Sequence, residues 1–297
     1  MRAIVTGGAG FIGSHVVDAL LTRGDDVLVL DDLSRGKREN VPEGAQLEVV
    51  DIREPLDFRD AEVCFHLAAQ VDVRVAVERP EHDAQVNVLG TVNVLEAARR
   101  HGTQVVFAST GGAIYGECER PAPEDAPRQP LSPYGVSKLA GEEYVAAYSR
   151  LYDTGHVSLR YGNVYGPRQD PHGEAGVVAI FLGRLAGGER PRIFGDGRQT
   201  RDYVYAGDVA RATLAAVGKR GVFNVGTGIE TSVLELYELC RKVAGSELEA
   251  DHAEARLGEL QRSVLDVTRA ERELGWRPEV GLEDGLQRTW GSLQPRS

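Results

Sequence analysis

Residues 6–13, TGGAGFIG, decide the fold that we expect for this chain. They lie between an apolar run, AIV, and an amphipathic one, FIGSHVVDALL, so a strand should pass through a tight turn into a helix. Glycines permit that turn, a close approach of the backbone to a phosphate, and tight packing of the helix on the strand. The N-terminus of the helix offers N–H groups to the same phosphate. Gly7, Gly10 and Gly13 therefore predict a dinucleotide-binding turn.

The next apolar run, DVLVL, ends at Asp31, eighteen positions beyond Gly13. A carboxylate at that place accepts hydrogen bonds from the ribose hydroxyls of NAD and repels the 2′-phosphate of NADP. Arg35, Lys37 and Arg38 follow in a loop and would suit a 2′-phosphate, although a solvated loop face explains them more simply. The pattern favours NAD and leaves NADP open.

Short apolar runs alternate with amphipathic stretches from residue 2 to about residue 104. Such βαβ repetition is typical of a parallel sheet wrapped by helices. The strict alternation is lost from about residue 165, which indicates a second lobe. We therefore expect an α/β fold, a Rossmann-type doubly wound parallel sheet with a smaller C-terminal substrate-binding lobe. The expected domains are 1–164, joined by a strand and a helix from about 200–228, and 165–297.

Composition argues against several classes of partner. The 297 residues include 45 acidic and 34 basic ones, for a net charge of -11, without a Lys/Arg-dense run, so we expect no nucleic acid partner. No apolar run approaches the length of a membrane span, and one begins almost at Met1, so we expect no membrane partner, no leader and a cytoplasmic protein. Cys64, Cys118 and Cys240 lack ligand spacing, which predicts reduced, mostly buried thiols and no metal site.

The stretch YGVSK places Tyr134 and Lys138 four residues apart on an expected helix, so both side chains face the same way. An ammonium beside a phenol lowers the pKa of the phenol, as a general base for a sugar hydroxyl requires. The spacing alone is common on solvated helices. It gains weight because it follows a nucleotide-binding turn and a strand, VVFAST, that ends in Ser109 and Thr110.

Taken together, these motifs resemble the extended short-chain dehydrogenase/reductase family, and within it the UDP-hexose 4-epimerase branch. The resemblance spans nearly the whole chain. The motifs that carry it are TGGAGFIG, DIR from Asp51, HLAAQ from His66, NVLGTVNVLEAA from Asn87, STGGAIYG from Ser109, SPYGVSK from Ser132, LRYGNVYGPR from Leu159 and RDYVYAGDVA from Arg201.

The resemblance implies catalytic roles for four residues. Tyr134 is then the base, and Lys138 binds the nicotinamide ribose and lowers the pKa of the tyrosine. Thr110 relays the proton of the sugar 4-hydroxyl. Ser109 is the reserve for that role, because the extra glycine in STGGAIYG leaves the register open.

The resemblance also implies two binding sites. The NAD site comprises Gly7, Gly10, Phe11, Ile12, Gly13, Asp31, Asp32, Asp51, Ile52, Leu67, Ala68, Ala69, Gln70, Asn87, Tyr134, Lys138 and Tyr161. The UDP-sugar site comprises Thr110, Asn163, Val177, Arg192, Phe194, Arg201 and Arg256. Arginine suits a diphosphate because its planar fork donates two bonds at once. Outside these sites, we expect Asp208 to brace a loop and a helix start, and His66 to be a satisfied core histidine.

The implied reaction is reversible epimerisation at C4 of a UDP-hexose, such as UDP-glucose and UDP-galactose, with NAD as transient oxidant and a 4-keto intermediate. Ser263 is small where some family members carry a bulky tyrosine, so we expect the N-acetylhexosamine pair to be tolerated, although a serine on a solvated strand explains it equally well. Helices 87–101 and 133–150 resemble the pair that forms a dimer interface in the family. We therefore expect a homodimer.

Three alternatives stay open. A nucleotide-sugar 4,6-dehydratase needs an acid and a base for elimination, but Gly111 and Gly112 follow Thr110 where similar dehydratases carry Asp-Glu. A UDP-glucuronate 4-epimerase would need a donor for the sugar carboxylate. A non-catalytic NAD-binding sensor or scaffold commonly lacks the tyrosine or the lysine, whereas this chain has both.

Overall fold

A computed structural model describes residues 1–171, 176–255 and 260–294 of the chain. Its main feature is one sheet of seven strands in the order β11-β6-β5-β4-β1-β2-β3, in which every neighbouring pair is parallel. The strands are β1 (Arg2–Thr6), β2 (Asp26–Asp31), β3 (Gln46–Val49), β4 (Val63–His66), β5 (Gln104–Thr110), β6 (Val157–Tyr161) and β11 (Gly221–Val225). The expected Rossmann-type sheet is confirmed.

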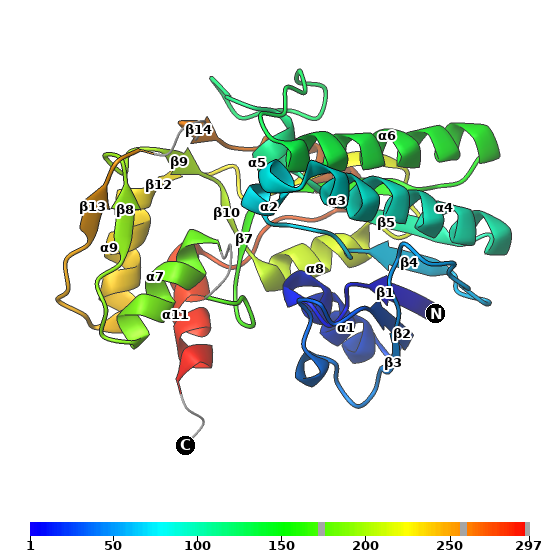
Figure 1. The fold of residues 1–297 in the computed structure, drawn as a ribbon, viewed down its shortest axis with the longest axis horizontal. Helices are drawn as coiled ribbons and strands as arrows, with labels where there is room; N and C mark the ends of the chain where they lie inside the picture. Colours follow the sequence, from blue (N-terminus) through cyan, green and yellow to red (C-terminus); the bar gives the residue numbers. More distant parts are fainter. Residues whose placement is uncertain (172–175, 256–259, 295–297) are drawn as a thin grey trace.

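Helices cover both faces of this sheet (Figure 1). One face carries α1 and α8, which pack on each other, and the other carries α4 and α6 with the short helices before α4. The helices of the two faces are α1 (Phe11–Arg23), α8 (Ala206–Ala215), α2 (Val73–Glu78), α3 (Pro80–Ala84), the π-helix η2 (Gln85–Leu89), α4 (Gly90–His101) and α6 (Pro133–Tyr152). The short helices α5 (Gly111–Ile114) and α10 (Thr268–Leu274) follow other strands or loops.

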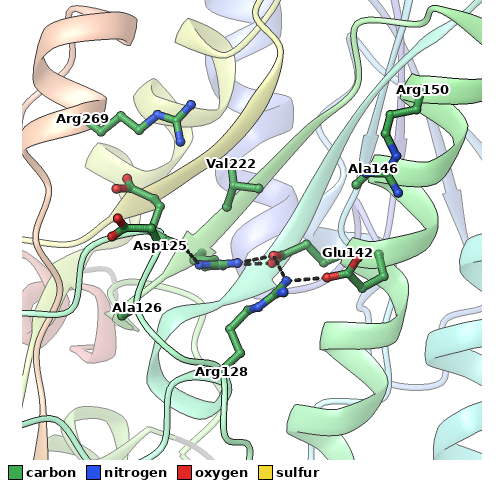
Figure 2. A pocket seen from close by; sticks show the side chains of 11 residues that line it. Asp125, Ala126, Arg128, Glu142, Ala146, Arg150, Val222 and Arg269 are labelled. Carbon is green, nitrogen blue, oxygen red and sulfur yellow. Dashed lines mark hydrogen bonds and ion pairs between the residues drawn. The ribbon is translucent and has the colours of Figure 1, made fainter.

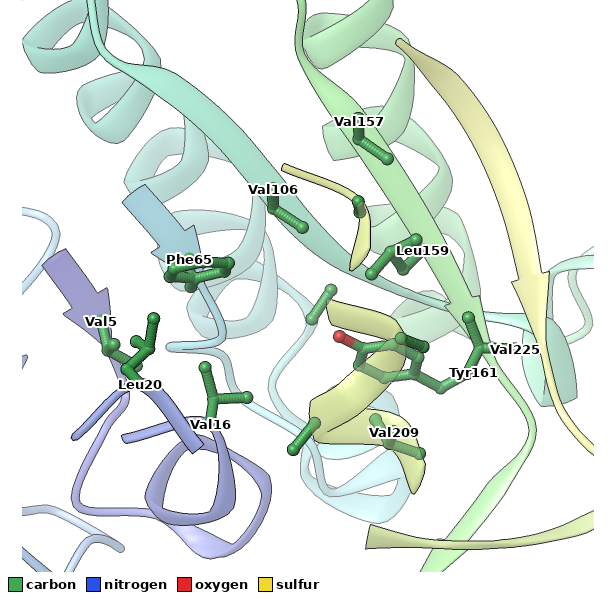
Figure 3. Close-up of a cluster of buried hydrophobic side chains, with 14 of the residues drawn as sticks. Val5, Val16, Leu20, Phe65, Val106, Val157, Leu159, Tyr161, Val209 and Val225 are labelled. Atoms are coloured by element: carbon green, nitrogen blue, oxygen red, sulfur yellow. The ribbon is translucent and has the colours of Figure 1, made fainter. Parts of the chain in front are cut away.

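The core lies in two layers, one on each face of the sheet, because successive side chains of a strand point to opposite faces. On β1, Val5 belongs to the layer beneath α1 and α8, whereas Ile4 belongs to the layer beneath α4. Figure 3 shows part of the first layer. Burial on both faces explains why strands such as AIV and DVLVL are continuous apolar runs rather than alternating ones.

The same alternation separates the two hydroxyls at the end of β5. Val105 and Phe107 belong to the α4 and α6 layer, and Val106 and Ala108 to the opposite layer. Ser109 therefore points toward α6, and Thr110 points the other way at the carboxyl edge of the sheet.

The second lobe gathers α7, α9 and α11 around its own core, with short strand pairs beside them (Figure 1). Its helices are α7 (Val177–Ala186), α9 (Val233–Ala244) and α11 (Leu282–Leu293). Its strands are β7 (Asn163–Tyr165), β8 (Arg192–Phe194), β9 (Thr200–Arg201), β10 (Tyr203–Tyr205), β12 (Thr231–Ser232), β13 (Asp251–Ala253) and β14 (Arg262–Ser263). Both α8 and β11 return to the main sheet after the chain has entered this lobe.

Two further observations concern the described residues alone. None of their helices is long and apolar enough to cross a membrane. No three His, Cys, Asp or Glu side chains gather among them as metal ligands would.

Candidate active site

The turn between β1 and α1 leaves no space for a side chain at Gly7 or Gly13. Gly7 has φ +72°, and a Cβ on it would lie 2.6 Å from the Ala68 nitrogen. A Cβ on Gly13 would lie 2.0 Å from the Gly7 carbonyl oxygen. Gly10 caps α1 without a side-chain hydrogen bond, so the first N–H groups of the helix are left for a ligand. This turn fits a pyrophosphate.

Asp31 lies at the end of β2 against this turn. Its carboxylate accepts hydrogen bonds from the backbone N–H groups of Ala9 and Leu33, each at 2.9 Å. Burial raises the pKa of Asp31, and the two hydrogen bonds act in the opposite direction by lowering it. Among the basic residues that follow, Arg35 lies 3.5 Å from the Asp72 carboxylate, so its charge is partly balanced within the protein.

Several predicted NAD-binding residues follow β3 and β4 or lie just before α4. The Gln70 N–H donates to the Asn87 side-chain oxygen at 2.9 Å, and the Asn87 amide donates to the Gln70 carbonyl at 2.8 Å. Asp51 accepts from the Arg53 guanidinium, and the Ile52 side chain is buried against Gly90. These contacts bring the ends of β4 and the start of α4 to one edge of the sheet.

Other predicted NAD-binding residues are placed as follows. Phe11 and Ile12 open α1, and Leu67, Ala68 and Ala69 follow β4 beside Gly7. Asp32 is exposed and accepts from the Ser34 hydroxyl at 2.6 Å. The Tyr161 ring lies in the core, where its hydroxyl meets the Thr213 hydroxyl at 2.8 Å, so any contact of Tyr161 with a cofactor would fall to its backbone.

Tyr134 and Lys138 occupy the first turns of α6, which begins with Pro133 after an N-cap at Ser132. The Lys138 ammonium is buried, donates to the Ala108 carbonyl at 2.9 Å, and lies 4.8 Å from the centre of the Phe107 ring. Burial lowers the pKa of Lys138 to about 8, while the negative charge of Asp83 opposes that shift.

The pKa of Tyr134 departs from the sequence-based expectation. Burial raises it, and the Asp83 carboxylate raises it further. Burial and Asp83 thus shift this pKa in the direction opposite to the one expected from Lys138, and the effect of Lys138 stays a prediction. Desolvation of the phenolate is the largest cause of the shift. The Lys138 ammonium itself donates to the Ala108 carbonyl and lies over the Phe107 ring.

The two hydroxyls of β5 have different surroundings. The Ser109 hydroxyl donates to the Glu142 carboxylate at 2.9 Å, beneath α6. A Cβ on Gly112 would lie 4.0 Å from the Thr110 hydroxyl and 3.4 Å from the Asn163 side-chain oxygen. The side chains of Thr110 and Asn163 thus both lie beside Gly112. The Ser109 hydroxyl is bonded to Glu142 instead.

Glu142 belongs to a buried ion pair that the sequence analysis missed. The Arg160 guanidinium donates to Glu142, to the Tyr115 hydroxyl and to the Glu124 carbonyl. The pair borders a polar cavity of about 400 Å³ further along α6, into which Arg128 also reaches (Figure 2). A charged residue within an apolar strand, SLRY, was the available signal.

Asp202 is a second missed residue. Its carboxylate accepts from the N–H and hydroxyl of Thr227, both at 2.7 Å, and from the Gly228 N–H at 3.0 Å. Its carbonyl accepts from the Asn163 N–H at 2.7 Å. Asp202 therefore links β7 to the turn that follows β11, and it positions Asn163.

Two predictions about residues outside the sites are confirmed. Asp208 accepts from the N–H groups of Glu279 and Val280 and from Arg211, as a brace would. His66 is buried and bonded to the hydroxyls of Thr6 and Thr91, and burial lowers its pKa to about 3.

The predicted UDP-sugar residues lie mainly on the second lobe. Val177 opens α7, Arg192 and Phe194 are on β8, and Arg201 is on β9, which pairs with β14. Ser263 on β14 is buried, not solvated. Arg256 and its neighbour Leu257 lie outside the described residues.

The chain belongs to the NAD dependent epimerase/dehydratase family, whose model matches residues 3–226. It is 48% identical to the UDP-glucose 4-epimerase of Mycolicibacterium smegmatis, and the match covers 97% of each chain. Two solved structures are similar over 98% of each chain. They are the UDP-glucose 4-epimerase of Thermotoga maritima with UDP-glucose, at 45% identity and a TM-score of 0.94, and that of Thermus thermophilus with NAD, at 47% identity and a TM-score of 0.92. The family resemblance seen in the sequence is confirmed.

Proposed function

We propose that this protein is an NAD-dependent UDP-glucose 4-epimerase, which interconverts UDP-glucose and UDP-galactose through a transient 4-keto sugar. The observation that carries the proposal is similarity over the whole chain to proteins named UDP-glucose 4-epimerase, at 45–48% identity. The side chains that such a reaction needs are Tyr134, Lys138 and Thr110. In support, Lys138 donates to the carbonyl of Ala108, two residues before Thr110 on β5, and Tyr134 lies one turn before Lys138 on α6.

Bound NAD supplies the transient hydride acceptor for C4 of the hexose. Gly7, Gly10 and Gly13 hold its pyrophosphate, and Asp31 binds the adenosine ribose. Lys138 binds the nicotinamide ribose. The positive charge of an oxidised nicotinamide would favour the phenolate of Tyr134, which burial alone disfavours.

Tyr134 moves the proton in this proposal. As phenolate it takes the proton of the sugar 4-hydroxyl, directly or through Thr110, while the hydride leaves C4. With NAD bound, the hydride would be returned to the opposite face of the 4-keto sugar after the sugar turns over, and Tyr134 would return the proton. Positioning and electrostatics are the contribution of the protein.

The UDP-sugar site is proposed from Thr110, Asn163, Val177, Arg192, Phe194, Arg201 and Arg256. Asn163 flanks the same space as Thr110, which supports its place beside the sugar. Gly111 and Gly112 provide no acid or base after Thr110, which disfavours the dehydratase alternative. Tolerance of an N-acetylhexosamine is proposed from the small side chain of Ser263, which is buried on β14.

We also propose a homodimer, because the outer face of α6 and the turn before α4 expose large apolar side chains. These are Leu89, Val136, Tyr144, Leu151 and Tyr152. Leu89, Val136 and Tyr144 fall within the helices 87–101 and 133–150 that are expected to form a dimer interface. Leu151 and Tyr152 are the last two residues of α6, just beyond that range. A cytoplasmic location stays a prediction.

The deciding experiment is NMR of the purified protein with NAD and, in separate tubes, UDP-glucose, UDP-galactose, UDP-N-acetylglucosamine and UDP-glucuronate. We expect the 4-epimer of UDP-glucose to appear, and Tyr134→Phe to slow its appearance by at least about a hundredfold. Absence of turnover with every one of these sugars would overturn the assignment.

A further inference from the structure

Asp83 is a buried carboxylate that none of the predicted sites includes. It lies on α3, which packs against α6, and it is 0% exposed. One of its oxygens accepts from the Gln70 side-chain amide at 2.8 Å and from the Asn87 side-chain amide at 3.0 Å. The other oxygen is buried and has no hydrogen-bond partner among the described residues. Such an orphaned oxygen is costly, so it calls for an explanation.

Lys138 is a buried positive charge on the helix that packs against α3. Its ammonium is 3% exposed, and its hydrogen bond goes to a neutral carbonyl of β5. Within the described part of the chain it forms no ion pair. A buried ammonium without a counter-charge is unfavourable, and a carboxylate on the neighbouring helix α3 supplies one through space.

The charges around α6 single out Asp83 for this role. Apart from burial, the Asp83 carboxylate is the charge that acts on both Tyr134 and Lys138. Asp72 lies near Arg35 and caps α2, and Glu142 is paired with Arg160, so each of these carboxylates has its own partners. His66 is held neutral by burial.

We propose that Asp83 is a positioning residue whose buried carboxylate holds Gln70 and Asn87 together and balances the Lys138 ammonium across the α3 and α6 interface. It is placed to set the pH range in which the Tyr134 and Lys138 pair works, without touching the sugar. This inference deepens the proposed function, but its main readout, the titration of Tyr134, needs neither a sugar nor turnover.

The test replaces Asp83 by asparagine, which keeps an acceptor for Gln70 and removes the charge. Ionisation of Tyr134 is followed by ultraviolet difference absorbance, with the Tyr134→Phe signal subtracted in each background. We expect Tyr134 to ionise at a pH lower by about one unit in Asp83→Asn. Both limbs of the activity profile against pH should move to lower pH, because the phenol and the ammonium each lose their proton more easily.

Asp208→Asn is the matched control, since it removes another buried, hydrogen-bonded carboxylate that braces the fold elsewhere. It should lower stability without moving the titration of Tyr134. Asp83→Glu, which keeps the charge, should leave that titration near its original pH. A Tyr134 titration that is unchanged in Asp83→Asn would overturn the proposal, whatever the activity.

A second measurement covers the case in which Asp83→Asn does not fold. Lys138→Met removes the ammonium that Asp83 balances. The double variant Asp83→Asn/Lys138→Met should therefore recover folding at pH 6. Where the parent, the two single variants and the double variant all fold, urea denaturation gives an unfolding equilibrium constant for each. The effects of the two substitutions on that constant should differ from additivity by at least about fivefold. Equal instability of the single and double variants would exclude the charge pairing.

Discussion

At the scale of single residues, the structure separates two adjacent hydroxyls that the sequence left as alternatives. Thr110 shares the space beside Gly112 with Asn163, whereas Ser109 donates to Glu142 beneath α6. We therefore expect Thr110→Val to lower kcat by about a hundredfold. Ser109→Ala should keep kcat within about threefold and lower the free energy of unfolding by about 1–2 kcal/mol, because the buried Glu142 loses a donor.

Steady-state kinetics and urea denaturation of both variants check this prediction. Thr110→Ser is the matched control, since it restores the hydroxyl and should recover most of the rate. The opposite pattern, with kcat lost in Ser109→Ala and retained in Thr110→Val, would move the proton relay to Ser109.

At the scale of elements, the β1 to α1 turn leaves no space for a side chain at Gly13. A Cβ there would lie 2.0 Å from the Gly7 carbonyl oxygen, so the turn must open. We expect Gly13→Ala to raise the dissociation constant for NAD at least about tenfold and to cost about 1–3 kcal/mol of stability. Calorimetry of NAD binding and thermal unfolding measure the two effects.

Gly187→Ala is a suitable control, because Gly187 ends α7 with φ -80° and a Cβ there would be 3.5 Å or more from its neighbours. It should leave NAD affinity unchanged. Unchanged affinity in Gly13→Ala as well would mean that this turn does not hold the cofactor.

At the scale of the whole molecule, an apolar stripe along α6 predicts assembly. Val136, Tyr144 and Leu151 recur at spacings of eight and seven residues, so they share one face of the helix, and they are 54%, 43% and 72% exposed. We expect a dimer in equilibrium sedimentation at micromolar concentration, and a monomer for the variant carrying Tyr144→Glu and Leu151→Glu.

Val49→Glu provides the comparison, because Val49 is 56% exposed on β3, at the edge of the sheet and outside the α6 stripe. It should sediment as the parent does. A parent protein that is monomeric at these concentrations would remove the homodimer from the proposed function.

Much of the site could be predicted because its motifs are local. The spacing of Tyr134 and Lys138 and the position of Asp31 after β2 follow from residues on one helix or at a strand end. Gln70 and Asn87 were assigned through the family resemblance, and their mutual hydrogen bonds appeared only in the structure. The ion pair of Glu142 with Arg160 and the braces made by Asp202 could not be predicted, because each joins segments far apart in the chain.

The sequence by itself determined the parallel sheet, the glycine turn and the pairing of a phenol with an ammonium, since steric limits on glycine and the periods of strand and helix act within a few residues. Only the tertiary structure decided that Ser109 bonds to Glu142 while Thr110 lies beside Gly112 and Asn163, and which way burial and Asp83 shift the pKa of Tyr134. The physical reason is that strand parity, desolvation and the charge of Asp83 depend on which distant elements pack together, as α3 packs on α6.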